Sequence, residues 1–151
     1  MDEIYIGSDH GGFELKDRLR GFLKGKGYNV VDVGPYEYDK DDDYPDYAEK
    51  VCKKVLETKG RGIIICKHAH GITIAANKMR GIYASPCWNE TSARMARVDN
   101  DTNVLCLSGV LTKPEEAEKI ADVWLSTPFS AEERHVRRIG KVRDIERRNF
   151  G

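Results

Sequence analysis

Short apolar runs alternate along this chain with stretches in which apolar residues recur every three or four positions. The runs have the length and the aliphatic content of buried strands, and they predict five strands at residues 4–7, 29–33, 62–66, 82–86 and 103–107. The spaced pattern predicts helices between and after these strands, and the last two helices are expected at residues 114–125 and about 130–149.

Repeated strand–helix units predict a parallel, doubly wound α/β sheet of about five strands with helices on both faces. We therefore expect a Rossmann-like, three-layer α/β/α sandwich. No linker, internal repeat or low-complexity tract interrupts the 151 residues, so we expect one domain spanning residues 1–151. Ligands of such sheets bind beyond the carboxyl ends of the strands.

Composition narrows the classes of function. Charged residues make up 33% of the chain and apolar residues 40%, as is typical of a soluble globular protein. The formal net charge is zero, so nothing attracts the whole chain to nucleic acid or to an anionic membrane. No apolar stretch approaches the length of a membrane span, and the N-terminus predicts a strand rather than a signal peptide. We expect a cytoplasmic protein with reduced thiols at Cys52, Cys66, Cys87 and Cys106.

Cys66 ends the third predicted strand and is followed by a tight loop and a helix start. The positive end of a helix dipole favours a thiolate over a thiol, and loop amides can hold an anion that forms beside the sulfur. A base beside such amides can remove a proton next to a carbonyl group. Considered without further information, however, a cysteine in this position is more often a small apolar core residue.

Other polar side chains flank the predicted strands. Asp9 and His10 follow the first strand, Asp32 lies at the end of the second, and the Asp99-Asn100 pair precedes the fifth. We expect these groups to converge with the Cys66 loop at the carboxyl edge of the sheet. An aspartate N-cap beside an exposed histidine is the simpler explanation of Asp9 and His10 taken alone.

Five motifs follow one another over nearly the whole chain: SDHGGFELK at 8–16, DYPDYA at 43–48, IAANK at 74–78, NDTNVL at 100–105 and RHVRR at 134–138. Together they resemble the signatures of the RpiB/LacA/LacB family of sugar-phosphate isomerases. Within that family, the motifs are most similar to those of the ribose-5-phosphate isomerase B branch.

The resemblance implies an aldose–ketose isomerase that interconverts ribose 5-phosphate and ribulose 5-phosphate through a cis-enediolate. It implies a small-molecule sugar phosphate as ligand, no metal or organic cofactor, and no nucleic-acid or membrane partner. It also implies a homodimer or a dimer of dimers with active sites at the dimer interface. We expect the C-terminal helix, at about 130–149, to pack on the partner subunit.

The resemblance also implies a role for each matching residue. Cys66 is the base that carries the proton between C2 and C1, and Asp9 holds a sugar hydroxyl and assists ring opening. Substrate binding is expected of His10 through phosphate, Tyr44 in the sugar pocket, Asn100 at the enediolate, and a phosphate clamp of Arg134, His135 and Arg138. A solvated basic face is the ordinary meaning of a cationic run like the one that contains this clamp.

The loop after the cysteine departs from the family pattern. Where the family has Gly-Thr-Gly, this chain has Lys67-His68-Ala69, and His70 and Gly71 follow. An imidazole at His68 can donate and accept protons in place of the threonine hydroxyl. We expect Lys67, His70 and Gly71 to contact the substrate.

Two further positions depart from the pattern. Val98-Asp99 stands where the ribose-phosphate enzymes carry Glu-His, and Val110 stands where the family often has a phosphate-binding arginine. An aspartate of ordinary pKa accepts a proton readily but is a poor acid at pH 7. The group that opens the sugar ring could therefore be Asp99, His68 or His70. Lys67 is a candidate to replace the missing arginine, whose loss would weaken phosphate binding by about 1.5–3 kcal/mol.

Three alternatives remain open. The substrate could be another aldose phosphate, such as allose 6-phosphate or galactose 6-phosphate. A non-catalytic sugar-phosphate-binding subunit of a mixed oligomer would keep the same motifs. Finally, His68 and His70, with Asp99 and His10, have ligand types suited to zinc, although the resemblance implies no metal.

Overall fold

The computed structural model describes residues 3–150 of the chain. Its strands are β1 (Glu3–Ser8), β2 (Asn29–Asp32), β3 (Arg61–Cys66), β4 (Ala84–Pro86) and β5 (Val104–Ser108). Its helices are the short 3₁₀ helix η1 (His10–Gly12), α1 (Phe13–Gly25), α2 (Tyr44–Thr58), α3 (His70–Ala76), α4 (Glu90–Asn100), α5 (Pro114–Ser126) and α6 (Glu133–Asn149).

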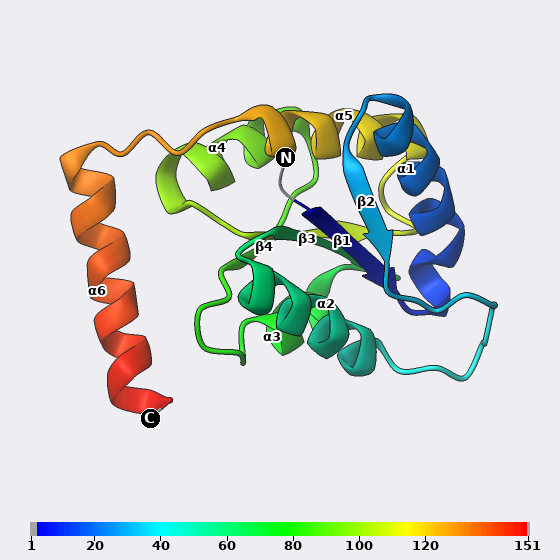
Figure 1. The fold of residues 1–151 in the computed structure, drawn as a ribbon, viewed down its shortest axis with the longest axis horizontal. Helices are drawn as coiled ribbons and strands as arrows, with labels where there is room; N and C mark the ends of the chain where they lie inside the picture. Colours follow the sequence, from blue (N-terminus) through cyan, green and yellow to red (C-terminus); the bar gives the residue numbers. More distant parts are fainter. Residues whose placement is uncertain (1–2, 151) are drawn as a thin grey trace.

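The five strands form one parallel sheet in the order β2-β1-β3-β5-β4 (Figure 1). Ile6 on β1 lies opposite Ile63 on β3, which in turn lies opposite Leu105 on β5. This arrangement confirms the predicted Rossmann-like α/β sandwich. The chain winds outward in one direction from β1 and in the other from β3, so the loops after these two strands diverge and leave a place for a ligand at the carboxyl edge.

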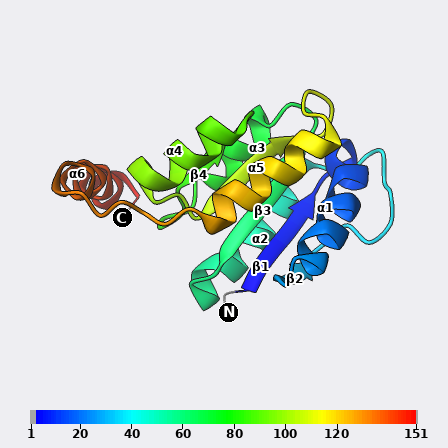
Figure 2. The ribbon, with the colours of Figure 1, turned by 90° about the horizontal axis from the view of Figure 1, so that it is seen from above.

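Helices cover both faces of the sheet. Helices α1, α4 and α5 lie on one face, and α2 and α3 lie on the other (Figures 1 and 2). On the central strand β3, Ile63 and Ile65 pack into the first of these two cores, and Ile64 packs into the second. Because both faces of β3 are covered, its apolar run shows no polar alternation. The packed sheet is a rigid support for the loops at its edges.

Two predicted bounds are wrong by two or three residues. The fourth strand begins at Ala84 rather than at residue 82, because the Ile82 N–H donates to the Met79 carbonyl in a turn. The last helix begins at Glu133 rather than at residue 130, because Ala131 has a φ of 54°, a left-handed conformation that interrupts a right-handed helix.

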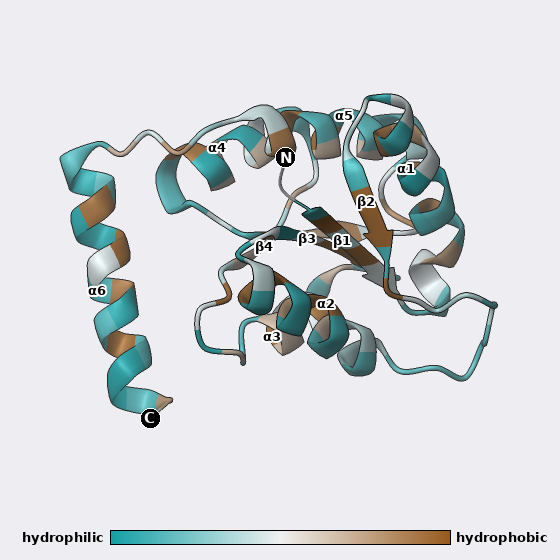
Figure 3. Ribbon diagram, viewed as in Figure 1, coloured by the Kyte–Doolittle hydropathy of each residue, from teal (hydrophilic) through white to brown (hydrophobic). Residues whose placement is uncertain are grey.

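Helix α6 stands apart from the sheet at the end of a non-helical segment, residues 127–132 (Figures 1 and 2). Apolar side chains on it remain about half exposed, among them Val136, Val142 and Ile145, and Figure 3 shows apolar bands along this otherwise hydrophilic helix. A single chain therefore leaves apolar surface on α6 uncovered. Within residues 3–150, every helix is too short or too polar for a bilayer span.

Candidate active site

The loop after β1 carries two of the predicted site residues. Asp9 is the N-cap of η1 and accepts a hydrogen bond from the Gly11 N–H at 2.9 Å. The residue is only 5% exposed, and this burial raises the pKa of the Asp9 carboxyl above its ordinary value. A buried carboxyl group with a raised pKa is suited to exchange a proton with a bound hydroxyl group.

His10 is fixed by Asp42, an acid that the sequence analysis did not single out. Oδ1 of Asp42 accepts the His10 backbone N–H at 2.8 Å and lies 2.8 Å from His10 Nδ1. This carboxylate raises the pKa of His10. The Asp42 side chain is 6% exposed, and within the described residues its Oδ2 atom is buried without a hydrogen-bond partner. Because Asp42 lies in an acidic run, residues 39–43, no sequence signal separates it from its neighbours.

The loop after β3 begins at Cys66, which is 5% exposed. Main-chain contacts hold this loop against the end of β5: the Gly109 N–H donates to the Cys66 carbonyl at 2.9 Å, and the Ser108 hydroxyl donates to the Lys67 carbonyl at 2.6 Å. Ala69 has a φ of 70°, which turns the chain into α3 at His70. The predicted order of strand, tight loop and helix start is therefore confirmed.

Three glycines let the loops of this edge approach each other closely. A Cβ at Gly11 would lie 2.8 Å from the Lys67 nitrogen, and a Cβ at Gly109 would collide with the Gly11 carbonyl. At Gly71, a Cβ would lie 2.5 Å from the Tyr44 ring. Since no side chain fits at these contacts, the loops after β1, β3 and β5 and the start of α2 form one packed unit. The structure thus brings together six of the predicted site residues: Asp9, His10, Tyr44, Cys66, Lys67 and Gly71.

The other three cysteines are also buried: Cys52 on α2, Cys106 on β5 and Cys87 just after β4. Burial raises the pKa of the Cys52 thiol to about 12 and that of the Cys87 thiol to about 11. The pKa of Cys106, in the middle of β5, is raised for the same reason. These three groups remain neutral thiols near pH 7, so none of them is a candidate base.

The side chains of Lys67, His68 and His70 are exposed around the Cys66 loop. Among residues 3–150, the one group of three side chains spaced to hold a metal ion consists of Asp9, His10 and Asp42. The zinc set considered above, His68 and His70 with Asp99 and His10, is therefore not assembled within one chain. Hydrogen bonds within the group and to the backbone of residues 10 and 11 explain the packing of Asp9, His10 and Asp42.

A second group of predicted residues lies around the start of α6. His135 is buried, with its Nε2 atom 3.3 Å from Asp99 Oδ1 and its Nδ1 atom 2.7 Å from the Ser130 hydroxyl. Asn100 is the last residue of α4 and lines a cavity together with Ile139 and Val142 of α6. Arg134 and Arg138 are exposed on α6, and Arg134 pairs with Glu132 at 3.0 Å.

The expectation that Asp99 and Asn100 converge with the Cys66 loop is wrong for a single chain. Helix α4 runs from the carboxyl end of β4 back toward the amino end of β5, so its last residues lie on the amino side of the sheet. The Cys66 loop lies at the opposite, carboxyl edge. Figures 1 and 2 also show α6, which carries the arginines, beyond the side of the sheet formed by β4.

Asp32 does lie at the carboxyl end of β2, but its partners give it a structural role. Its carboxylate accepts hydrogen bonds from the fully buried Lys16 at 2.9 Å and from the Gly34 N–H at 2.9 Å, and it also pairs with Arg20. A buried ammonium group needs such a partner. Asp32 therefore holds α1 and the loop after β2 in place, and it is not expected to bind a ligand.

Comparison with known proteins gives an independent result. Residues 4–142 match the profile of a family described as Ribose/Galactose Isomerase. The chain is 43% identical to a probable ribose-5-phosphate isomerase B of Mycoplasma genitalium, with 92% of each chain covered. It is 35% identical to ribose-5-phosphate isomerase B of Mycobacterium tuberculosis, with 95% of this chain and 90% of that chain covered.

Solved structures show the same similarity. Ribose-5-phosphate isomerase B of Clostridium thermocellum superposes with a TM-score of 0.93 at 44% identity, covering 97% of this chain and 98% of that one. The Mycoplasma genitalium protein with bound ribulose-5-phosphate superposes with a TM-score of 0.92 at 41% identity, covering 96% of each chain.

Proposed function

Because the chain belongs to the ribose/galactose isomerase family, we propose that it interconverts ribose 5-phosphate and ribulose 5-phosphate. Membership makes it an aldose–ketose isomerase. The choice of this sugar pair is supported by relatives named ribose-5-phosphate isomerase B that cover nearly the whole chain, one of them solved with ribulose-5-phosphate.

In the proposed reaction, the Cys66 thiolate removes the proton from C2 of the open-chain aldose. The electron pair moves to O1, which gives a cis-enediolate. The thiol then returns the proton to C1, while the O2 hydroxyl proton passes to O1 and C2 becomes the carbonyl carbon. Two observations support this role: Cys66 lies where β3 meets the loop, and the first amides of α3 have no acceptor within their own helix.

Asp9 and His10 complete this half of the proposed site. The raised pKa of Asp9 suits a group that holds a sugar hydroxyl and assists ring opening. The raised pKa of His10 favours the imidazolium, which can donate to a phosphate oxygen. In the same proposal, Tyr44 and Gly71 border the sugar, and the exposed Lys67 and His70 contact the substrate.

The other half of the proposed site comes from a second copy of the chain. Asn100, Arg134, His135 and Arg138 lie on the amino side of the sheet or on α6, so in the folded chain they lie away from its own Cys66 loop. A homodimer, or a dimer of dimers, joins the two halves if α6 packs on the partner. The half-exposed apolar side chains of α6 supply a surface for that contact.

Ring opening is the step with three candidate groups. His68 lies on the Cys66 loop, as does His70, and both are exposed. Asp99 lies in the other half of the proposed site, where its carboxylate contacts the His135 imidazole at 3.3 Å. An acid–imidazole pair can both take and give a proton, which supports Asp99 as the group that opens the ring.

The test is a panel of sugar phosphates assayed with the purified protein and with Cys66→Ser. The parent should convert ribose 5-phosphate to ribulose 5-phosphate faster than it isomerises allose 6-phosphate or galactose 6-phosphate. Cys66→Ser should lose at least about a thousandfold in kcat with an unchanged circular dichroism spectrum, since a hydroxyl group is a much weaker base than a thiolate. Cys87→Ser is the matched control and should stay active.

Each opposite result would reject part of the proposal. A higher kcat/KM on a six-carbon substrate would change the assigned sugar. Binding of ribose 5-phosphate without turnover would identify a sugar-phosphate-binding subunit. Full activity in Cys66→Ser would remove the cysteine from its role.

A further inference from the structure

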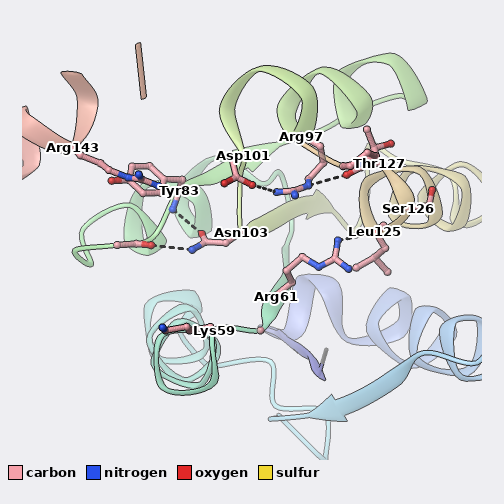
Figure 4. A pocket seen from close by; sticks show the side chains of 13 residues that line it. Lys59, Arg61, Tyr83, Arg97, Asp101, Asn103, Leu125, Ser126, Thr127 and Arg143 are labelled. Atoms are coloured by element: carbon pink, nitrogen blue, oxygen red, sulfur yellow. Dashed lines mark hydrogen bonds and ion pairs between the residues drawn. The ribbon is translucent and has the colours of Figure 1, made fainter. Parts of the chain in front are cut away.

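A cavity of about 500 Å³ opens on the side of the molecule away from the Cys66 loop (Figure 4). Its walls come from segments that lie at the amino edge of the sheet, including Lys59 before β3, Tyr83 before β4, Asp101 before β5 and the end of α5. Arg143 of α6 closes one side. None of the predicted catalytic or substrate-binding residues lines this cavity.

The cavity is strongly cationic. Its described lining holds four cations, Lys59, Arg61, Arg97 and Arg143, against one carboxylate, that of Asp101. Such an excess is unexpected in a chain whose formal net charge is zero. Cations gathered around a concave surface raise the local concentration of anions.

Arg97 is held in a fixed orientation within this cavity. Its side chain is 11% exposed, and its Nη1 atom lies 3.0 Å from Asp101 Oδ1. The guanidinium group also donates to the carbonyls of Thr102 and Thr127, the latter at 3.2 Å. A guanidinium group held in this way loses little conformational freedom when it binds an anion.

Trp124 lies beneath the same cations. Its ring is fully buried, 5.9 Å from Arg97 Cζ and 5.6 Å from Arg61 Cζ. Arg61 also donates to the Leu125 carbonyl at 2.8 Å at the cavity wall. Neutralisation of these guanidinium charges would change the electric field at the indole. Trp124 is therefore a built-in reporter of an anion in the cavity.

We propose that this cavity binds a small phosphorylated molecule with at least two negative charges, at a site separate from the substrate site. Because the Nε and Nη1 groups of Arg97 already donate within the protein, a ligand would be held mainly by the cationic field of the cavity and by direct contact with the exposed Lys59 and Arg143. The volume lies in the range of small-molecule sites. Lys59 and Arg143 lie at the rim as two further charges. The site does not depend on the proposed isomerase chemistry.

A ligand in this cavity can influence the second group of predicted residues through helices α4 and α6. Arg97 lies on α4 three residues before Asn100, and Arg143 lies on α6, which also carries Arg134 and Arg138. A phosphorylated ligand that contacts both arginines would tie α6 to α4. Among residues 3–150, the side-chain ties between α6 and the body are few; they include the Tyr83 hydroxyl donating to Glu146 at 2.7 Å and the His135–Asp99 contact. The ligand should therefore change activity as well as bind.

The experiment uses inorganic pyrophosphate as the probe and Trp124 emission as the readout. Trp88→Phe removes the other of the two tryptophans, so the signal reports Trp124 alone. In this background, pyrophosphate titrated at constant ionic strength should produce a saturable change in emission. Lys59→Gln/Arg143→Gln should weaken the affinity by about tenfold or more, because two charges leave the rim. The same titration followed by turnover should show a saturable change in kcat or KM that the variant lacks.

Two controls separate this site from other effects. Lys24→Gln/Lys113→Gln removes two exposed charges away from the cavity and should leave the titration unchanged. Arg134→Gln/Arg138→Gln removes the proposed substrate clamp and should also leave the Trp124 response in place, so the emission readout does not depend on the isomerase proposal. An equal response in the parent and in Lys59→Gln/Arg143→Gln, or no saturable response in the parent, overturns the inference.

Discussion

The two regions that hold the predicted site residues are built in different ways. The loops after β1 and β3 are packed main chain against main chain, which leaves no space for a side chain at Gly11 or Gly109. The region around Asp99 and His135 is held by side-chain contacts, and it adjoins a helix with exposed apolar residues. The first region is therefore preformed within one chain, whereas the second has the features of a surface that another copy completes.

A mixing experiment tests this difference most directly. Cys66→Ala disables the first region, and Arg134→Gln/Arg138→Gln disables the second, so each variant alone should lose at least about 100-fold of the activity. After joint refolding, about one quarter of the parent activity should return, because half of the random dimers are mixed and one of their two sites is intact. The rate of ribulose 5-phosphate formation measures the recovery.

The matched control mixes Cys66→Ala with Asp9→Ala, both in the first region. No mixed dimer of these two variants contains an intact site, so this mixture should remain inactive. Recovery in the control, or no recovery in the first mixture, would contradict a site shared between chains.

The group that opens the sugar ring can be assigned to one of the two regions by mutation. We expect Asp99→Asn to lower turnover of ribose 5-phosphate by about 100-fold, the usual contribution of a positioned acid or base. It should spare the exchange of the C1 proton of ribulose 5-phosphate with D₂O, since this acyclic ketose has no ring to open. Proton NMR measures the exchange. If His68→Asn or His70→Asn shows this pattern instead, the ring-opening group belongs to the Cys66 loop.

Stability should also differ between the two regions. Gly109→Ala forces a Cβ into the Gly11 carbonyl, and we expect the free energy of unfolding to fall by at least about 2 kcal/mol. Gly140 on α6 has open space around it among the described residues, so Gly140→Ala should raise helix stability by about 0.5–1 kcal/mol. Urea unfolding measures both, and equal effects would contradict the difference in packing.

The smallest expected effect concerns His10 and pH. Its pKa is raised by Asp42 above the ordinary value of 6.5, so the folded state binds this proton more tightly than the unfolded state does. The resulting stability is complete below the ordinary pKa and is lost as the pH rises through the folded-state pKa. Asp42→Asn should lower the His10 pKa and remove this dependence, as measured by NMR titration and urea unfolding. Asp43→Asn, a change at the exposed neighbouring acid, should leave both unchanged.

Much of the fold could be predicted because its signals are local. The isoleucine run of β3 and the spaced apolar residues of α2 and α5 reflect the geometry of single strands and helices. The misplaced starts of β4 and α6 depend instead on a turn at Ile82 and a left-handed residue at Ala131. Neither Ile82 nor Ala131 is of a usual turn-forming type, although Gly81, with a φ of 88°, is a turn signal in the first of these two places.

For the candidate site, the sequence offers candidate residues but not the way in which they assemble. The strand-end position of Cys66 and the loop position of Asp9 follow from the order of elements along the chain. The prediction that Asp99 lies at the carboxyl edge is wrong because proximity to β5 in sequence does not say at which end of β5 a residue lies. The return direction of α4 decides that, and it places Asp99 on the amino side.

By itself, the sequence determined a parallel α/β sheet, its helices and a cysteine at the carboxyl end of a central strand, since hydrophobic periodicity follows from backbone geometry. Only the tertiary structure decided that Asp42 hydrogen-bonds His10, that Asp99 contacts His135, and that four cationic side chains line one cavity. These contacts join segments distant along the chain, and their energies depend on burial and mutual orientation, which no local pattern encodes.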